Sequence, residues 1–599
     1  MDMSTSAKGQ AADGVDAQPA PTEYTDDRCD DWQNSSDAFQ AFDRVLHGLE
    51  GKITGGISPI AIAMAGFDWA AHMANAPFHR AELAIDAWMC GLRMMAALAG
   101  VNEIEPAADD HRFVSEGWAK EPYRGFMQWF LLAQGWTEEA TSCLSGVSCE
   151  NGRIARFVAR QGLDMFSPSN IPWANPEVIA TTLAEGGRNL FEGAVNALTD
   201  MSALATGSPP LTRFKPGRNV AVARGKVVFR NELIELLQYA STTGTVRAEP
   251  VLITPAWIMK YYIMDLSPHN SLIHFLVAQG FTVFCISWRN PGVDMRETSF
   301  DAYRSDGFLA ALDAVGHICG DVRVHACGYC LGGTLLAITA AAMARDGDKR
   351  LASVSLFAAQ TDFSEAGELQ LFINEPQIAF LEDAMADRGY LDGKQMGGAF
   401  QLLRSRDLIW SRMVKNYWLG RGDEPNDLMA WNDDATRLPA RMHSEYLRRL
   451  FLHNDLAEGR YLVDDRPIAL SDIQVPLFVV GTAADHVAPW CSVFKIHLLN
   501  PGEITFVLTS GGHNAGIVSE PGHPQRHFRI ATRMPGTPYV GPESWFECIS
   551  PQEGSWWPVW TNWLAARSRE EEIAPPSIGN AAAGLPAIDD APGSYVLER

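Results

Sequence analysis

The sequence predicts an α/β fold, in which a doubly wound sheet with helices on both faces follows a mainly helical N-terminal domain. Three observations lead to this prediction. From about residue 226 onward, short runs of β-branched and aromatic residues alternate with segments of helical spacing. Between residues 39 and 225 the apolar residues follow helical spacing without such runs. A strand-to-helix junction near residue 330 carries the pattern Gly-x-Cys-x-Gly, which is typical of a tight turn.

The N-terminal part divides into a tail and a helical domain. Residues 1–38 are rich in Ala, Asp, Ser, Thr and Pro and hold few large apolar side chains, so we expect them to be disordered. Residues 39–225 carry apolar side chains at helical spacing, and we expect those of Phe67, Trp88 and Leu92 to lie in the helical core.

Cys330 lies at the strand-to-helix junction and is the candidate nucleophile. Gly328 and Gly332 flank it at minus two and plus two, where a strained turn leaves no room for side chains. Such a turn lifts the thiol to the start of a helix, and the helix dipole there favours the thiolate. The alternative is a buried structural cysteine, which is the reading we prefer for Cys327.

Two further strand ends carry an acid and a histidine in the order that an α/β-hydrolase uses. A buried-strand pattern over residues 475–481 precedes Asp485, and another over residues 504–508 precedes His513. Taken singly, Asp485 is a candidate helix cap and His513 an ordinary loop histidine. Because all three residues follow strands, a catalytic triad is the better interpretation. We therefore predict an α/β-hydrolase catalytic domain over residues 226–565.

Other features complete this domain. The long interval between Cys330 and Asp485 leaves room for a lid insertion at about residues 361–465. Backbone N–H groups of Leu331 and of Ile258 or Trp257 are the expected oxyanion donors, since this fold places them after the nucleophile and after an earlier strand. The charged, proline-containing residues 566–599 are expected to form a flexible tail.

The composition excludes several classes of protein. A formal net charge of −24 over 599 residues argues against nucleic-acid binding. Ten cysteines without a disulfide framework or metal spacing indicate a reducing compartment, and we expect neither metal nor cofactor. The chain has no segment typical of a transmembrane helix, and no secretory signal is expected. Arg404 is one of several basic residues in or near the lid that are candidates to contact an anionic substrate.

Several blocks of residues together resemble the class I poly(3-hydroxyalkanoate) synthases, which are also called poly-β-hydroxybutyrate polymerases. The similarity extends from about Leu46 to Leu564. The matching blocks are Lys260–Leu266, Ser287–Pro291, Gly328–Gly333, Trp431–Thr436, Asp485–Trp490, Gly512–Gly516 and Gly554–Pro558. The chain departs from the family at Met259, where Asn is usual, and at Asn514, where an aliphatic residue is common.

The resemblance implies a cytoplasmic enzyme that polymerises (R)-3-hydroxyacyl-CoA, such as 3-hydroxybutyryl-CoA, through an acyl-Cys330 intermediate and releases CoA. It also implies association with polyester granules and their proteins, a homodimer aided by the helical domain, and a lid in which Trp431 and Arg404 approach the substrate channel. Two alternatives stay open. An acyl-CoA thioesterase or intracellular polyester depolymerase would use the same triad with water as acceptor. A catalytically inactive granule scaffold would not need the three residues in order.

Overall fold

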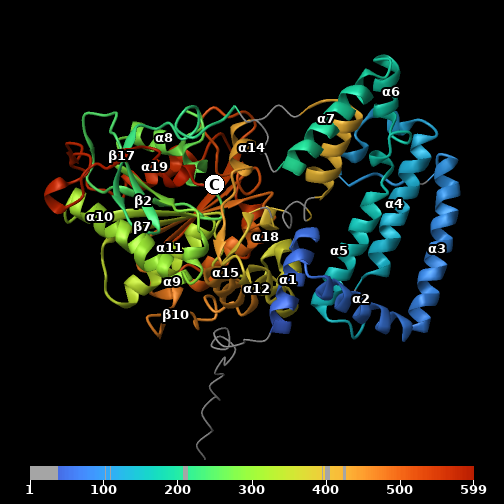
Figure 1. Cartoon of the computed structure of the whole chain (residues 1–599), viewed down its shortest axis with the longest axis horizontal. Helices are drawn as coiled ribbons and strands as arrows, with labels where there is room; N and C mark the ends of the chain where they lie inside the picture. Colours follow the sequence, from blue (N-terminus) through green and yellow to red (C-terminus); the bar gives the residue numbers. More distant parts are fainter. Residues whose placement is uncertain are drawn as a thin grey trace, which may run out of the picture.

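The computed structural model describes residues 38–599, apart from residues 55, 102, 108–109, 143, 207–212, 394, 398–401, 403–404 and 423–425. The tail expected at residues 1–38 lies outside the described residues but for its last member. In Figure 1 a layer of long helices from the N-terminal part stands beside a larger body built on one sheet.

The N-terminal part is helical, as predicted. Its helices are α1 (Ala38–Ile53), α2 (Pro59–Ala74), α3 (Pro77–Leu98), α4 (Tyr123–Ala140), α5 (Cys149–Met165), α6 (Pro176–Ala184) and α7 (Arg188–Thr206). Prolines stand at the first turn of α2, α3 and α6, where their missing N–H groups are not needed. Side chains of Ser58, Ser148 and Asn175 accept hydrogen bonds from the first turns of α2, α5 and α6.

The expected burial of apolar residues in this layer is wrong for three positions. Phe67 is 76% exposed, Trp88 is 71% exposed and Leu92 is 49% exposed. Helix α3 forms the outer edge of the molecule (Figure 1). Of its residues only Leu83 and Ala97 are buried, so most of its apolar side chains have nothing to pack against in this chain.

The second part contains an eleven-stranded sheet in the order β15-β14-β13-β12-β7-β6-β4-β5-β2-β1-β17. Its strands are β1 (Gly225–Arg230), β2 (Ile234–Tyr239), β4 (Val251–Thr254), β5 (Val283–Trp288), β6 (Val324–Tyr329), β7 (Leu351–Phe357), β12 (Leu477–Thr482), β13 (Ile504–Thr509), β14 (His527–Arg533), β15 (Gln552–Glu553) and β17 (Asp589–Asp590). The six central strands from β13 to β5 run parallel, and the strands at both edges are antiparallel. This confirms the predicted fold class.

Helices cover both faces of the sheet, because its central strands are apolar on both sides. In β4, Leu252 contributes to one core and Val251 and Ile253 to the other. Helices α10 (Ala310–Cys319) and α11 (Leu331–Arg345) pack into the first core, and α8 (Leu272–Ala278) and α19 (Trp557–Ala565) into the second. Because the central strands are parallel, the carboxyl ends of β4, β6, β12 and β13 lie at the same edge of the sheet.

A mostly helical insertion separates β7 from β12, in the place where we expect a lid. It includes α12 (Glu375–Ala386), α14 (Asp427–Asn432), α15 (Ala440–Glu445) and the helical turn η11 (Tyr446–Leu452). Hydrogen bonds connect the N-terminal part to this insertion. The Gln377 side chain accepts a hydrogen bond from the Ser58 N–H at 2.7 Å and donates one to the Gly56 carbonyl at 2.6 Å. His47 Nδ1 lies 2.8 Å from Asp383 Oδ2.

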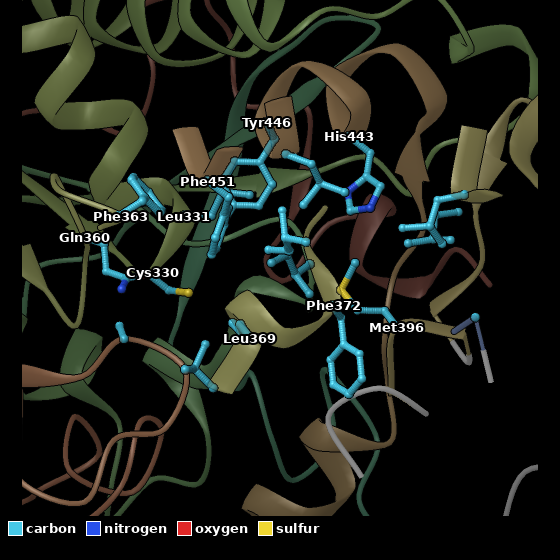
Figure 2. Close-up of a pocket in the computed structure, with 18 of the residues that line it drawn as sticks. Cys330, Leu331, Gln360, Phe363, Leu369, Phe372, Met396, His443, Tyr446 and Phe451 are labelled. Carbon is cyan, nitrogen blue, oxygen red and sulfur yellow. The ribbon is translucent and has the colours of Figure 1, made fainter. Parts of the chain in front are cut away.

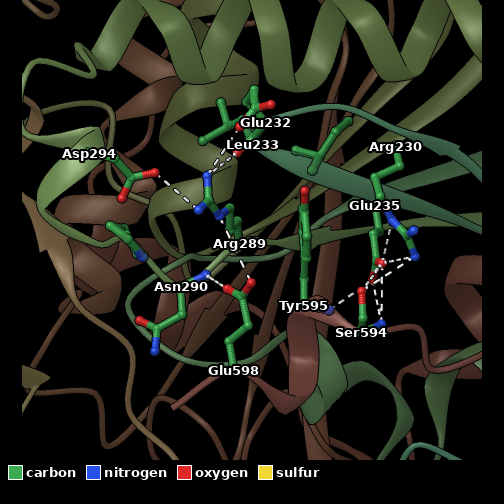
Figure 3. A network of polar contacts seen from close by, with 12 residues as sticks. Arg230, Glu232, Leu233, Glu235, Arg289, Asn290, Asp294, Ser594, Tyr595 and Glu598 are labelled. Atoms are coloured by element: carbon green, nitrogen blue, oxygen red, sulfur yellow. Dashed lines mark hydrogen bonds and ion pairs between the residues drawn. The ribbon is translucent and has the colours of Figure 1, made fainter.

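The C-terminal segment differs from the flexible tail that the sequence suggested. After α19 the chain adds β17 to the edge of the sheet beside β1. The buried Glu235 carboxylate of β2 then accepts hydrogen bonds from the Ser594 N–H at 2.9 Å, the Ser594 hydroxyl at 2.6 Å and the Tyr595 N–H at 3.0 Å (Figure 3). Arg230 forms an ion pair with the same carboxylate. A buried carboxylate needs such partners, and the tail supplies most of them.

The last residues also join two of the blocks that the sequence singled out. The ammonium group of Lys260 donates to the Glu598 carbonyl at 2.7 Å, and the Asn290 N–H donates to the Glu598 carboxylate at 2.9 Å. Arg289 Nε lies 3.9 Å from Oε1 of the same carboxylate and forms an ion pair with it (Figure 3). The resemblance blocks around Lys260 and Asn290 thus anchor the C-terminus.

We predict that Glu235→Ala lowers the thermal unfolding midpoint and frees the tail. The variant leaves the N–H groups of Ser594 and Tyr595 without their acceptor, and each buried polar group left unsatisfied costs about 1–3 kcal/mol. Differential scanning fluorimetry measures the first effect, and limited proteolysis with mass spectrometry of the C-terminus measures the second. Glu232→Ala, at a fully exposed carboxylate nearby, is the matched control. A Glu235→Ala tail that resists protease as the wild-type tail does would contradict this account.

Candidate active site

Cys330 occupies the turn between β6 and α11 with a backbone φ of 52°, which non-glycine residues rarely adopt. The glycines on either side explain how the turn closes. A Cβ atom on Gly328 would lie 2.5 Å from the Gly333 Cα, and one on Gly332 would lie 2.2 Å from the Thr254 carbonyl oxygen. The chain therefore needs glycine at both positions. The close approach of Gly332 also brings the cysteine turn against the end of β4.

His513 and Asp485 follow β13 and β12, and the structure brings both to Cys330. The His513 Nδ1 atom lies 2.8 Å from Asp485 Oδ2. Since an ionised carboxylate only accepts, Nδ1–H donates and Nε2 is left for the thiol. The Cys330 side chain lies close enough to His513 to act on the charge of its imidazole. The three residues stand in the arrangement of nucleophile, base and orienting acid.

Asp485 is held on all sides by the protein. Its Oδ2 atom also accepts from the Thr482 hydroxyl at 2.6 Å. Its Oδ1 atom accepts from the N–H groups of Val487 at 2.9 Å and Ala488 at 2.8 Å. Its side chain is 0% exposed. These contacts leave the carboxylate in position to orient His513 and give it no exposed oxygen.

The charges of this pair support each other. Burial raises the pKa of Asp485, but the charge of His513 and the hydrogen bonds from His513, Thr482 and the Ala488 N–H outweigh burial and hold that pKa below its ordinary value. Burial lowers the pKa of His513, but the charges of Asp485 and Cys330 and its hydrogen bonds to both raise that pKa well above its ordinary value. The raised pKa of His513 makes its imidazole a stronger base than a free histidine, and the ionised Asp485 beside it stabilises the protonated ring.

Two positioning contacts were not foreseen from the sequence. The Tyr329 hydroxyl, next to the cysteine, donates to the Asn514 side chain at 2.6 Å. This bond ties the cysteine turn to the histidine loop, and it gives a place to the asparagine that departs from the family pattern. Thr482 is the second such residue. Its position three residues before Asp485 was the available signal, because a hydroxyl there can reach the carboxylate.

The two candidates for the second oxyanion donor differ in their surroundings. Ile258 lines the same cavity as Cys330 and Leu331. Trp257 is buried, and its indole stacks on Tyr303 with ring centroids 4.3 Å apart. Thr436 fixes this loop through hydrogen bonds to the carbonyls of Trp257 and Ile258. Since Leu331 and Ile258 line the cavity beside Cys330 and Trp257 does not, Ile258 remains the candidate for the second donor.

The cavity that opens at Cys330 is mostly apolar and is roofed by the insertion (Figure 2). It encloses about 960 Å³ of space, its mouth included. Side chains from the sheet body and the insertion line it, among them Leu331, Phe363, Leu369, Phe372, Tyr446 and Phe451. It shares Ile57, Phe372 and Gln377 with a second hollow between the insertion and helices α2 and α5. The thiol therefore faces an apolar cavity that is lined from both the sheet body and the insertion.

Of the two expected channel residues, the structure places Trp431 away from this cavity. Trp431 is buried elsewhere, and its indole N–H donates to the Lys260 carbonyl at 2.8 Å, so it fastens the insertion to the segment after the oxyanion loop. Arg404 lies outside the described residues. None of the described helices is both long and apolar enough to span a bilayer.

Comparisons with known proteins place the chain in a family. The family described as poly-β-hydroxybutyrate polymerase (PhaC) N-terminus matches residues 109–276, a second described as poly-β-hydroxybutyrate polymerase N terminal matches residues 37–79, and the α/β hydrolase fold matches residues 249–520. The poly(3-hydroxyalkanoate) polymerase of Methylorubrum extorquens is 41% identical over 514 residues, which are 85% of this chain and 84% of that protein. The polymerase subunit PhaC of Cupriavidus necator is 34% identical over 84% of this chain and 86% of its own length. With this identity over most of both lengths, the chain belongs to the poly(3-hydroxyalkanoate) polymerase family.

Proposed function

We propose that this protein polymerises (R)-3-hydroxyacyl-CoA, with 3-hydroxybutyryl-CoA as the representative short-chain substrate, into a polyester and releases CoA. The observation that carries the proposal is the Cys330–His513–Asp485 arrangement at the end of an apolar cavity, in a chain of this family. Family membership supports an enzyme that makes polyesters. The acyl-cysteine route rests on the geometry of the thiol.

The first step forms the acyl-enzyme. His513 Nε2 takes the proton of the Cys330 thiol, and the thiolate attacks the thioester carbon of the substrate. Backbone N–H groups of Leu331 and Ile258 stabilise the oxyanion. The bond from carbon to the CoA sulfur breaks, CoA leaves with the proton from His513, and an acyl-Cys330 remains. Exchange of one thioester for another is nearly balanced in energy, which suits a cysteine nucleophile.

The second step lengthens the chain. His513 takes the proton from the 3-hydroxyl group of the incoming unit or chain end, and the resulting alkoxide attacks the acyl-Cys330 carbonyl. A new ester bond forms, the thioester to Cys330 breaks, and the proton of His513 returns to the thiolate. Asp485 acts through His513, because its four hydrogen bonds and its burial keep it from the hydroxyl. The insertion limits the access of water to the acyl-enzyme.

The outer helix α3 supports a homodimer. Its exposed side chains Phe78, Ile85 and Leu92 repeat every seven residues, and Trp88 and Met95 form a second row at the same interval. This is the spacing of a seam between paired helices. We assign this seam to a second copy of the chain. The exposed apolar residues of α2, which include Met64 and Phe67, are where we place contact with the polyester granule in the cytoplasm.

Cys330→Ala is expected to abolish CoA release from 3-hydroxybutyryl-CoA, because no other group can carry the acyl intermediate. Cys330→Ser should retain a small remnant at most. Purified protein is incubated with the substrate while thiol release and turbidity are followed together. Wild-type protein that releases CoA without turbidity would be a thioesterase. Polymer formed by Cys330→Ala would rule out the proposed nucleophile.

Asp485→Asn is expected to slow elongation more than acylation, so that acyl-enzyme accumulates. A thiol ionises with little help, whereas an aliphatic hydroxyl depends fully on an oriented base. Loss of the orienting acid in a triad typically costs about 10⁴-fold in rate. Intact-protein mass spectrometry after brief mixing with substrate measures the trapped acyl group. Asp472→Asn, at a carboxylate remote from the site, is the control. Equal slowing of both steps, with no acyl group trapped, would count against the division of roles.

Ile85→Glu combined with Trp88→Glu is expected to convert the dimer to a monomer, since two charges in an apolar seam cannot be buried without partners. Sedimentation velocity measures the change. Leu498→Glu places the same charge at an exposed apolar residue of α17 (Ile496–Leu499) and should leave the dimer intact. If the double variant associates as tightly as the wild type, α3 is not the dimer seam.

A further inference from the structure

His443 of α15 reaches the cavity of Cys330 from the insertion (Figure 2). The residue is 5% exposed, and its Nδ1 atom has no hydrogen-bond partner in the described part of the chain. A buried polar atom without a partner is destabilising, so its presence calls for an explanation. The mechanism above makes no use of this side chain.

Three other polar side chains on the cavity wall, those of Thr334, Gln360 and Gln377, have partners within the protein. The Thr334 hydroxyl donates to the Gln360 carbonyl at 2.8 Å, and the Gln360 side chain donates to the Ser492 hydroxyl at 3.1 Å. The Gln377 side chain is bonded to Ser58 and Gly56. The His443 imidazole is therefore a polar group of the cavity wall that is available to a ligand.

The imidazole is suited to a neutral ligand. Burial lowers the pKa of His443 to about 4, so the ring is uncharged near neutral pH. A neutral imidazole has one N–H donor and one acceptor nitrogen. Such a group matches a carbonyl or hydroxyl oxygen better than a carboxylate or phosphate, which would favour a cation.

A growing polyester brings a series of such oxygens into the cavity. The carbonyl bonded to Cys330 would be met by the Leu331 and Ile258 N–H groups. The next ester carbonyl along the chain would lie among side chains such as Leu331, Phe363 and Phe451, which offer it no donor. We propose that His443 donates a hydrogen bond to an ester carbonyl of the bound chain beyond the unit attached to Cys330. This inference rests on the proposed function and names a chain-binding residue for it.

The test compares two CoA thioesters, one of 3-hydroxybutyrate and one of its linear trimer. The first-turnover kcat/KM for CoA release gives a ratio of trimer to monomer for each variant. His443→Leu should lower this ratio roughly tenfold, the effect of losing about one hydrogen bond to a buried carbonyl. His443→Gln, which keeps an N–H donor, should restore part of it. The thermal midpoint of His443→Leu should stay equal or rise, because an unpartnered polar atom has been removed.

His497→Leu is the matched control. His497 is also buried, has an unpartnered Nε2 atom and has its pKa lowered to about 4 by burial, but it packs on Phe494 and does not line the cavity. Its substitution should leave the trimer-to-monomer ratio as in the wild type. A wild-type ratio in both His443 variants overturns the proposal, as does a lower midpoint with an unchanged ratio. Wild-type protein that releases CoA from neither thioester overturns the proposed function itself.

Discussion

The left-handed backbone of Cys330 is the constraint on which the active site depends. Holding a residue with a side chain in this region costs about 1–3 kcal/mol, and the neighbouring packing must supply it. Here the Gly332 backbone rests against the carbonyls of Thr254 and Pro255, and the Cys330 N–H donates to the Phe357 carbonyl at 2.9 Å. The same contacts bring the thiol, the start of α11 and the loop of Ile258 to one point.

The histidine side of the site is fixed by a separate set of bonds. Asp485 accepts four hydrogen bonds, and only one of them comes from His513. The other three hold the carboxylate in place whatever the charge of the imidazole. Tyr329 and Asn514 then link this half of the site to the cysteine half. The two halves of the site are thus joined by a bond that does not involve the thiol.

Contacts from several other parts of the chain hold the walls of the Cys330 cavity in place. The insertion roofs the cavity, and bonds from Ser58 and His47 hold the insertion to the N-terminal helices. On the other side, the C-terminal residues bind Lys260 and Asn290, close to the oxyanion loop. Trp431 joins the same region through the Lys260 carbonyl. Blocks of sequence far from the triad thus shape the site through the scaffold around it.

The sequence alone determined the fold class and pointed to Cys330, Asp485 and His513 as the candidate triad, because strand patterns and small residues at a tight turn are local signals. It also indicated the helical N-terminal region and the place of the insertion. Tertiary structure decided what local patterns do not contain. The exposure of Trp88 depends on which neighbours α3 meets, and the binding of Ser594 and Tyr595 depends on a buried carboxylate more than 350 residues away in the chain. Trp431, which we expected near the substrate channel, instead binds the Lys260 carbonyl. His443 lines the cavity although the sequence did not suggest it, because helical spacing does not show which face of a helix lies toward the thiol.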